Sequence, residues 1–273
     1  MSKACLATLL PCGLIFCATS AWPLSFTGAA ALSGCLAYQG LLKSYGAVNY
    51  WPLGEASGTV AKDVIGANTG TYVNVTPATM MGQPGFSPVR NNSVSFSNAS
   101  STQVTTTTSY ASPQNLSVLV WFKTTTTLGG VIVQFSNTQT GTPSSYDRHI
   151  YMQDTSGTAG AIDWGVYPTA VKTIPSAAPV LNDGNWHMAI GVIGTAGQTL
   201  FVDQRTPVTV ATVTTAQVFT GYWRIGYGDV SGWTTPPAKN YFTGNIASVA
   251  YFTSQLTQAQ ANEIYAVGMK CGP

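Results

Sequence analysis

Hydrophobic and polar residues alternate in short runs along most of the chain, beginning at about residue 45. Runs such as "NSVSFSN", "LSVLVWFKT", "GGVIVQFS", "WHMAIGVI" and "NIASVAYF" are separated by clusters of Gly, Pro, Asn, Asp and Ser. Short strands at such spacing, about a dozen residues on average, are typical of a sandwich or jelly roll. Several runs are apolar throughout, which favours strands buried on both faces. We predict an all-β jelly-roll sandwich of two antiparallel sheets over residues 45–273.

The run "WHMAIGVI" shows how the pattern assigns faces to side chains. Trp186 and every second residue after it share one face of the predicted strand, and His187 lies on the other. The preceding "NDG" is a tight-turn signal. We therefore interpret His187 as one side chain of an ordinary strand.

One helix is predicted, near the C-terminus. In "LTQAQANEIYAVG", Thr257 is the expected N-cap, and Gln260, three residues later, completes a capping box. Ile264 and Tyr265 supply an apolar side, and Gly268 suits the position just after the last turn. We expect this short helix to pack across one edge of the sandwich.

The first 44 residues form a separate segment, because no charged side chain occurs between residues 4 and 42. Three interpretations stay open. One is a secretory or lipoprotein leader, in which "LSGC" would place a lipid on Cys35. Another is a membrane span, which Pro11 and Pro23 disfavour. The third, which we favour, is an apolar arm that packs into an assembly.

The five cysteines lie at the two ends of the chain, four of them in the apolar segment. A disulfide between Cys35 and Cys271 would close the whole domain if the chain ends meet, with a stabilisation of roughly 4–5 kcal/mol. Unpaired buried thiols are the alternative. An odd count leaves at least one cysteine unpaired or intermolecular.

Charged residues make up only 7% of the 273 residues, against about 25% in average soluble domains. The net charge of +2 is small and the basic residues are scattered, so nucleic acid is excluded as a partner. The polar surface is expected to consist of Thr, Ser, Asn and Gln, a composition that favours a surface or extracellular location.

Several motifs follow one another in a familiar order: "YWPLGEASGTVAKD", "LSVLVWFKT", "NDGNWHMAIGV", "QTLFVDQ" and "FTGNIASVAYFTSQLTQAQANEIYAVG". From about Tyr50 to Gly268 the chain resembles the laminin-G-like, concanavalin A-like jelly-roll superfamily, most of all its bacterial and phage branch. The resemblance implies adjacent chain ends, which would favour the Cys35–Cys271 disulfide. It also implies binding or structural roles more often than catalysis, with glycans or proteins as ligands and calcium in some members.

The chain departs from this family where acidic residues are common. "SNASSTQV" follows the "SF" motif, and Ala247 and Ser248 stand in place of two acids in "IASVA". Calcium takes about six to eight oxygen ligands, usually with several carboxylates, and only nine acidic residues exist here. We expect no cofactor, although Asp229 remains a candidate calcium ligand.

Catalytic arrangements are not apparent. Glycoside hydrolysis usually needs two nearby carboxyl groups, and no strand carries such a pair; Asp183 and Glu55 each stand alone. His187 or His149 beside Asp183 or Asp147 would suggest a triad, but a G-x-S-x-G elbow is missing. We interpret both histidines as structural, and "YDRHIY" as a strand edge with a local ion pair. We predict no catalytic residue and no enzyme.

The most unusual loop is "GDVSGWTTPPAKNYF". Trp233 lies outside any predicted strand and would stack on a sugar ring or anchor a protein contact. Nearby polar groups would bond the ligand, which gives a predicted binding set of Trp233, Asp229, Lys239, Asn240 and Tyr241.

The favoured function is a non-enzymatic jelly-roll protein on a virion surface, as a bacteriophage decoration or tail-associated adhesion protein. Its expected partners are other virion or surface proteins, through the N-terminal arm, and cell-surface glycans. A secreted or lipid-anchored bacterial lectin-like module, located outside the cell or as an outer-surface lipoprotein, is the alternative. A glycoside hydrolase is the third hypothesis.

Overall fold

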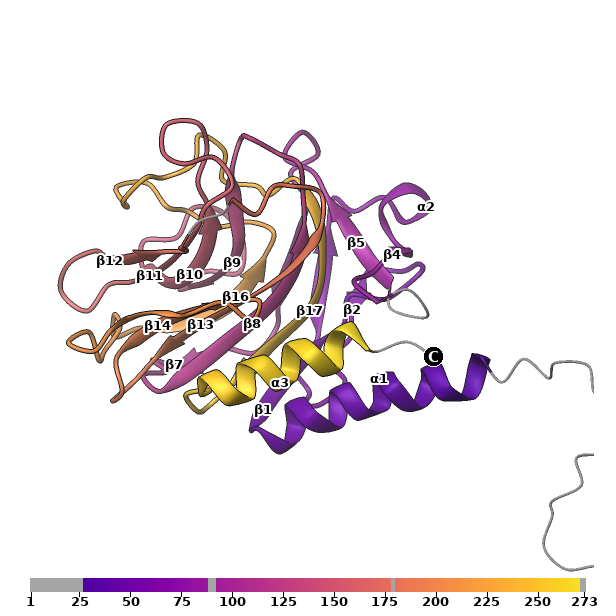
Figure 1. Cartoon of the computed structure of the whole chain (residues 1–273). Helices are drawn as coiled ribbons and strands as arrows, with labels where there is room; N and C mark the ends of the chain where they lie inside the picture. The colour runs from indigo at the N-terminus through magenta and orange to yellow at the C-terminus, as the bar shows by residue number, and fades with distance from the viewer. Residues whose placement is uncertain (1–26, 88–91, 178–179, 271–273) are drawn as a thin grey trace, which may run out of the picture.

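The computed structural model describes residues 27–87, 92–177 and 180–270, and the side chains from residue 36 onward. Two antiparallel β-sheets stack face to face, and two longer helices lie side by side along the outside of one sheet (Figure 1). The predicted all-β, two-sheet antiparallel sandwich with a short C-terminal helix is confirmed.

The eight-stranded sheet carries the central strands of the fold. Its order is β15-β14-β13-β8-β17-β5-β4, and β1 pairs with the C-terminal half of β17. The strands are β1 (Ala47–Trp51), β4 (Gln83–Pro84), β5 (Asn92–Phe96), β8 (Leu116–Lys123), β13 (Trp186–Ile193), β14 (Gln198–Val202), β15 (Val208–Val210) and β17 (Gly244–Phe252).

The nine-stranded sheet runs in the order β12-β11-β10-β9-β16-β6-β3-β2, and β7 pairs with β16. Its strands are β2 (Val60–Ala61), β3 (Gly70–Val73), β6 (Gln103–Thr106), β7 (Tyr110–Ala111), β9 (Gly130–Ser136), β10 (Tyr146–Met152), β11 (Ile162–Val166), β12 (Lys172–Pro175) and β16 (Thr220–Ile225).

The eight-stranded sheet is buried on both faces, which explains the continuous apolar runs in the sequence. Its inner face meets the other sheet in the main core, which includes Trp51, Phe122 and Trp223. Its outer face forms a second core with helices α1 (Thr27–Ser44) and α3 (Gln258–Met269), where Trp121 and Met188 pack. The predicted alternation along β13 is confirmed, since Met188 faces the helices and Ala189 the main core.

Helix α3 begins as the sequence predicts and ends later. The Thr257 side chain accepts from the Gln260 backbone N–H, and the Gln260 side chain accepts from the Thr257 N–H, which completes the capping box. The expected end at Gly268 is wrong, because the helix continues to Met269. A Cβ at Gly268 would lie 2.9 Å from the Trp121 ring, so this glycine permits close packing on β8.

Helix α1 shows that part of the apolar segment belongs to the packed domain. Tyr38 is fully buried and its hydroxyl accepts from Trp121 Nε1 at 3.0 Å. The arm over residues 1–44 stays a prediction, since the structure describes this segment only from residue 27. Cys271 and the Cys35 side chain lie outside the described residues. Of the described helices, including the four-residue α2 (Pro77–Met80), none is long and apolar enough to cross a membrane.

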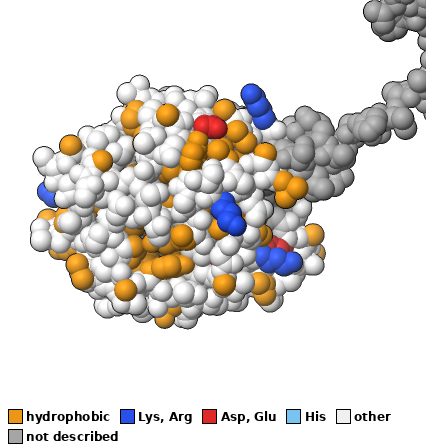
Figure 2. All heavy atoms as spheres, turned by 90° about the horizontal axis from the view of Figure 1, so that it is seen from below, with side chains coloured by type: hydrophobic (Ala, Val, Ile, Leu, Met, Phe, Trp, Pro, Cys, Tyr) orange, Lys and Arg blue, Asp and Glu red, His pale blue; other side chains and the backbone are white. Residues whose placement is uncertain are grey.

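The surface agrees with the expectation of uncharged polar groups. On the face seen in Figure 2, isolated Lys, Arg, Asp and Glu side chains are spread among uncharged polar atoms and small apolar patches. Long-range electrostatic attraction on this face is therefore weak.

A Tyr38→Phe variant tests whether α1 is integral to the domain. It leaves the buried Trp121 N–H without a partner, so we expect a loss of about 1–3 kcal/mol in the free energy of unfolding by urea. Leu36→Ala, at a position 61% exposed on the same helix, should change it by less than about 0.5 kcal/mol. Equal effects of the two variants would contradict this packing.

Candidate functional site

A surface hollow of about 260 Å³ lies on the outer face of the nine-stranded sheet, against the loop that follows β16. Four segments far apart in the sequence meet there: the start of β10, the β11–β12 turn, the segment before β16 and the loop after it. The residues that line it, called the Trp233 hollow below, are Ser144, Tyr146, Tyr167, Val171, Gln217, Ser231, Gly232 and Trp233.

Three aromatic rings surround the hollow. The Trp233 ring centroid lies 6.5 Å from that of Tyr146 and 6.3 Å from that of Tyr167. Trp233 is only 7% exposed because it rests on His149, 4.0 Å away, whereas Tyr167 is 36% exposed. A Cβ on Gly165 would lie 2.6 Å from the Trp233 ring, so a glycine is required beneath it.

The loop that carries Trp233 is held to the sheet at several points. The Tyr146 hydroxyl donates to the Ser231 carbonyl at 3.0 Å, and the Tyr151 hydroxyl donates to the Thr234 carbonyl. Thr235 Oγ1 donates to Asp163 at 3.0 Å. Burial raises the pKa of Asp163 to about 6, against the opposing effect of its hydrogen bonds. These bonds order the loop before any ligand arrives, which lowers the entropic cost of binding.

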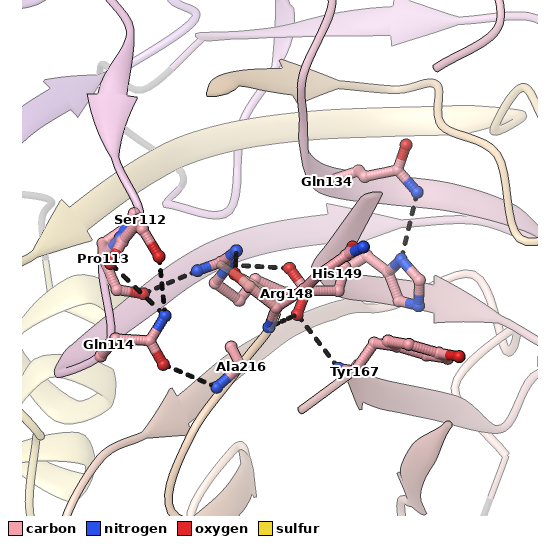
Figure 3. A network of polar contacts seen from close by, with 10 residues as sticks. Ser112, Pro113, Gln114, Gln134, Arg148, His149, Tyr167 and Ala216 are labelled. Carbon is pink, nitrogen blue, oxygen red and sulfur yellow. Dashed lines mark hydrogen bonds and ion pairs between the residues drawn. The ribbon is translucent and has the colours of Figure 1, made fainter. Parts of the chain in front are cut away.

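A buried ion pair lies behind the hollow (Figure 3). Arg148 Nε is 2.8 Å from Asp147 Oδ1, and both side chains are inaccessible to solvent. Asp147 Oδ2 accepts from the backbone N–H groups of Tyr167 and Gln217, at 3.0 and 2.7 Å. Arg148 donates to the carbonyls of Gln217 and Pro113. The pair therefore fixes two walls of the hollow from below.

Burial shifts the pKa values of both groups, and each partner's charge opposes the shift of the other. Burial raises the pKa of Asp147, and the charge of Arg148 opposes that shift. Burial also lowers the pKa of Arg148, against the effect of Asp147. The guanidinium further lies 4.6 Å from the Phe135 ring centroid and 4.9 Å from that of Phe219, which supports the buried cation. The local ion pair expected in "YDRHIY" is present, and it is buried rather than at an exposed edge.

His149 forms the floor beneath Trp233. Its Nδ1 lies 3.1 Å from Gln134 Nε2, which also donates to the Asp229 carbonyl. Since Gln134 Nε2 can only donate, Nδ1 accepts and the proton resides on Nε2. Burial lowers the pKa of His149 to about 3, so the ring is neutral at physiological pH.

The structure brings only one of the five predicted binding residues into the hollow. Trp233 lines it. Asp229 is buried and accepts from the Ser231 N–H at 2.8 Å, so it holds the loop. Lys239 is exposed elsewhere on the loop, and the Asn240 carbonyl accepts from the Val131 N–H. Tyr241 stacks on Tyr227 with centroids 4.2 Å apart.

Sequence reasoning missed Tyr146, Tyr167 and Gln217 as lining residues. Tyr146 belongs to the "YDRHIY" motif, but most of its neighbours in the hollow come from other segments. A tyrosine at the end of a strand carries no local signal that distinguishes a ligand contact from packing. Their proximity arises from the sheet order β12-β11-β10-β9-β16.

His187, the other histidine, lies between two carboxylates on the eight-stranded sheet. Its Nδ1 is 2.9 Å from Asp203 and its Nε2 is 3.0 Å from Asp183. Burial alone would lower the pKa of His187, but the hydrogen bonds to Asp203 and Asp183 outweigh it and raise the pKa. Neither histidine bonds a serine hydroxyl among the described residues, as a Ser-His-Asp triad would require.

In the described part of the chain, no three His, Cys, Asp or Glu side chains come together as a metal site. One carboxylate oxygen of Asp229, the candidate calcium ligand, accepts a hydrogen bond from the Ser231 amide.

Comparisons with known proteins show the fold without showing a family. No protein-family model matches the chain, and no curated protein matches it. Among solved structures, Trypanosoma rangeli sialidase is similar with a TM-score of 0.54 and 10% identity, over 89% of this chain and 38% of the sialidase. The binding domain of Paraclostridial Mosquitocidal Protein 1 is similar with a TM-score of 0.55 and 9% identity, over 81% of this chain and 52% of that one.

A protein described as the HCR/D W1238A mutant is similar at a TM-score of 0.53 and 12% identity, over 82% of this chain and 52% of its own. The chain thus spans about two fifths of the length of the sialidase and about half of the other two. At such low identity these likenesses establish a β-sandwich of the jelly-roll kind. None of the three is named as a phage or virion protein.

Two sequence-based expectations are overturned by these likenesses. The prediction of a non-enzymatic phage virion protein is contradicted, because the similar structures include sialidases, among them one in complex with sialic acid. The prediction that the chain is not an enzyme fails for the same reason, since one similar structure is named as a covalent intermediate. The physical cause of both errors is that a sandwich scaffold does not determine whether its protein performs chemistry.

The two histidines should titrate in opposite directions from the ordinary value of 6.5. We expect the His187 ring signal, followed by NMR, to titrate above 6.5 and the His149 signal near 3. Both should titrate near about 6.5 in concentrated urea, as the internal control. A His187 value below 6.5, or a His149 value near neutrality, would contradict the partners described.

The shifted pKa values of His149 and His187 make the free energy of unfolding depend on pH. The raised folded pKa of His187 contributes stability below pH 6.5 that is lost as the pH rises through the folded value. The lowered folded pKa of His149 contributes stability above pH 6.5 that is lost as the pH falls toward 3.

Proposed function

We propose that the protein is a carbohydrate-binding β-sandwich and that the Trp233 hollow binds a single sugar ring. The observation that carries the proposal is the combination of three aromatic rings with unused polar groups around one hollow. Neither the Gln217 side-chain amide nor the Tyr167 hydroxyl bonds another described residue.

The chemistry of the lining suits a sugar. A pyranose has apolar C–H faces, which pack on aromatic rings, and a rim of hydroxyls, which need donors and acceptors. Gln217 supplies both an amide donor and a carbonyl acceptor, and the Tyr167 hydroxyl supplies a further donor and acceptor. The volume of about 260 Å³ lies just below the range of about 300–1,000 Å³ for drug-sized ligands. One ring, rather than a long chain of rings, therefore fits.

The solved structures support the proposal indirectly. One of the similar structures described above is named as a binding domain, and another is a sialidase in complex with sialic acid. Membership of the laminin-G-like superfamily is part of the proposal and rests on the order of motifs between Tyr50 and Gly268.

The proposal extends to location and partners. A protein displayed outside the cell, secreted or held as a lipoprotein through Cys35, would meet glycans directly, and its low charge suits that setting. Glycans of cell surfaces are the proposed ligands. Other surface proteins are proposed partners of the segment 1–44.

Hydrolysis of a glycosidic bond is the second candidate, because the similar sialidases perform it. Sialidases use a tyrosine nucleophile, and Tyr72 donates to Glu55 at 2.7 Å beside a second hollow. Tyr72 is only 6% exposed, however, and burial and Glu55 raise the pKa of its hydroxyl far above neutrality. The Trp233 hollow holds no carboxylate. Binding therefore has the better geometric support.

The test is glycan-array binding by the full chain, followed by calorimetry with the best glycan. Tyr167→Ala should weaken binding about five- to tenfold, because one aromatic contact contributes roughly 1 kcal/mol. Tyr241→Ala is the matched control, since it removes a tyrosine that stacks outside the hollow. It should change the affinity less than about twofold.

Loss of binding in Tyr241→Ala alone would place the site at the sequence-predicted set instead. Absence of binding to any glycan would overturn the proposal. Release of sugar from the bound glycan, abolished in Tyr72→Phe, would replace it with the hydrolase.

A further inference from the structure

We propose that the Trp233 hollow selects an uncharged sugar, a hexose or N-acetylhexosamine, and discriminates against sialic and uronic acids. This inference rests on the proposed function and names the ligand class of the same site. Two observations carry it. None of the eight lining residues is a lysine, arginine or histidine, and the basic residues nearest to them in the sequence do not reach the hollow.

An acidic sugar needs a counter-charge in such a place. The hollow is bounded by aromatic rings and by Val171, which remove part of the water around a bound carboxylate. A carboxylate that loses water without gaining a cation or several donors pays a large desolvation penalty. Proteins commonly meet that need with arginine in bidentate contact.

Arg148 is the arginine behind this site, and it is not free to bind a ligand. Its Nε pairs with Asp147, and its two terminal nitrogens donate to the carbonyls of Pro113 and Gln217. The side chain is inaccessible to solvent. A ligand carboxylate would have to displace Asp147, which also holds the Tyr167 and Gln217 amides.

The two lysines near these segments also lie away from the hollow. Lys172 follows Val171, but it shares the strand face of Ile174, which packs in the main core. Lys239 is exposed beyond Ala238, whose N–H is bonded to Asp154. The Asp229 carboxylate is bonded to the amide of the lining residue Ser231, and its negative charge repels an anion.

The experiment compares matched glycans on the full chain. Lactose and chitobiose are the neutral probes, and sialyllactose and digalacturonate are the acidic ones. We expect the acidic glycans to bind at least about tenfold more weakly than the best neutral glycan. The neutral affinity should change less than about twofold between about 50 and 500 mM NaCl, because no charge pair forms.

A gained cation provides the converse test. Val171→Lys places an ammonium group on the rim, and we expect it to strengthen sialyllactose binding about fivefold in a salt-dependent manner. Leu36→Lys is the control, because Leu36 is 61% exposed on α1, which packs against the other sheet. It should leave both classes of glycan unchanged.

The outcomes separate this inference from the proposed function. Tight binding of sialyllactose that is lost in Tyr167→Ala would keep the site and overturn the neutral preference. No binding of either class would overturn the proposed function and this inference with it. Neutral binding that is lost in Tyr167→Ala and insensitive to salt would support both.

Discussion

The buried pair of Asp147 and Arg148 is the constraint on which the candidate site depends. Two opposite charges without solvent contact lose their hydration, and further hydrogen bonds compensate for part of that loss. The pair makes such bonds with backbone groups of Pro113, Tyr167 and Gln217, from three other segments. The strand β10, the β11–β12 turn and the segment before β16 are therefore tied to one another at a single point.

That tie determines the shape of the surface above it. Two of the bonded residues, Tyr167 and Gln217, turn their side chains toward the Trp233 hollow while their backbones are held below. The loop with Trp233 closes the third side, and it is held by side chains from β10 and β11. A preformed hollow with a rigid aromatic wall and adaptable polar groups is suited to recognition of a small, partly apolar ligand.

Other carboxylates in the chain also hold backbone groups in place, as Asp147 does. Asp63 accepts from the backbone N–H groups of Tyr50, Gly66 and Asn68, and so fixes the loop after β2. Asp203 accepts from the Met188 N–H and from His187. With only nine acidic residues in the chain, most of those described here organise backbone turns. The acidic residues are therefore scattered along the sequence, and each carboxylate has a structural partner of its own.

The sequence by itself determined the class of fold, the faces of β13 and the start of α3. These features depend on period-two alternation and on a capping box between Thr257 and Gln260, which are interactions within a few residues. It also indicated Trp233 as a loop tryptophan and an ion pair in "YDRHIY". Only the tertiary structure decided that Arg148 is buried, that Tyr167 and Gln217 join Trp233, and that Asp229 faces the loop backbone. Those contacts join residues far apart in the sequence, as the 85 positions between the bonded Tyr146 and Ser231 illustrate. Sheet order, which no local pattern encodes, brings them together.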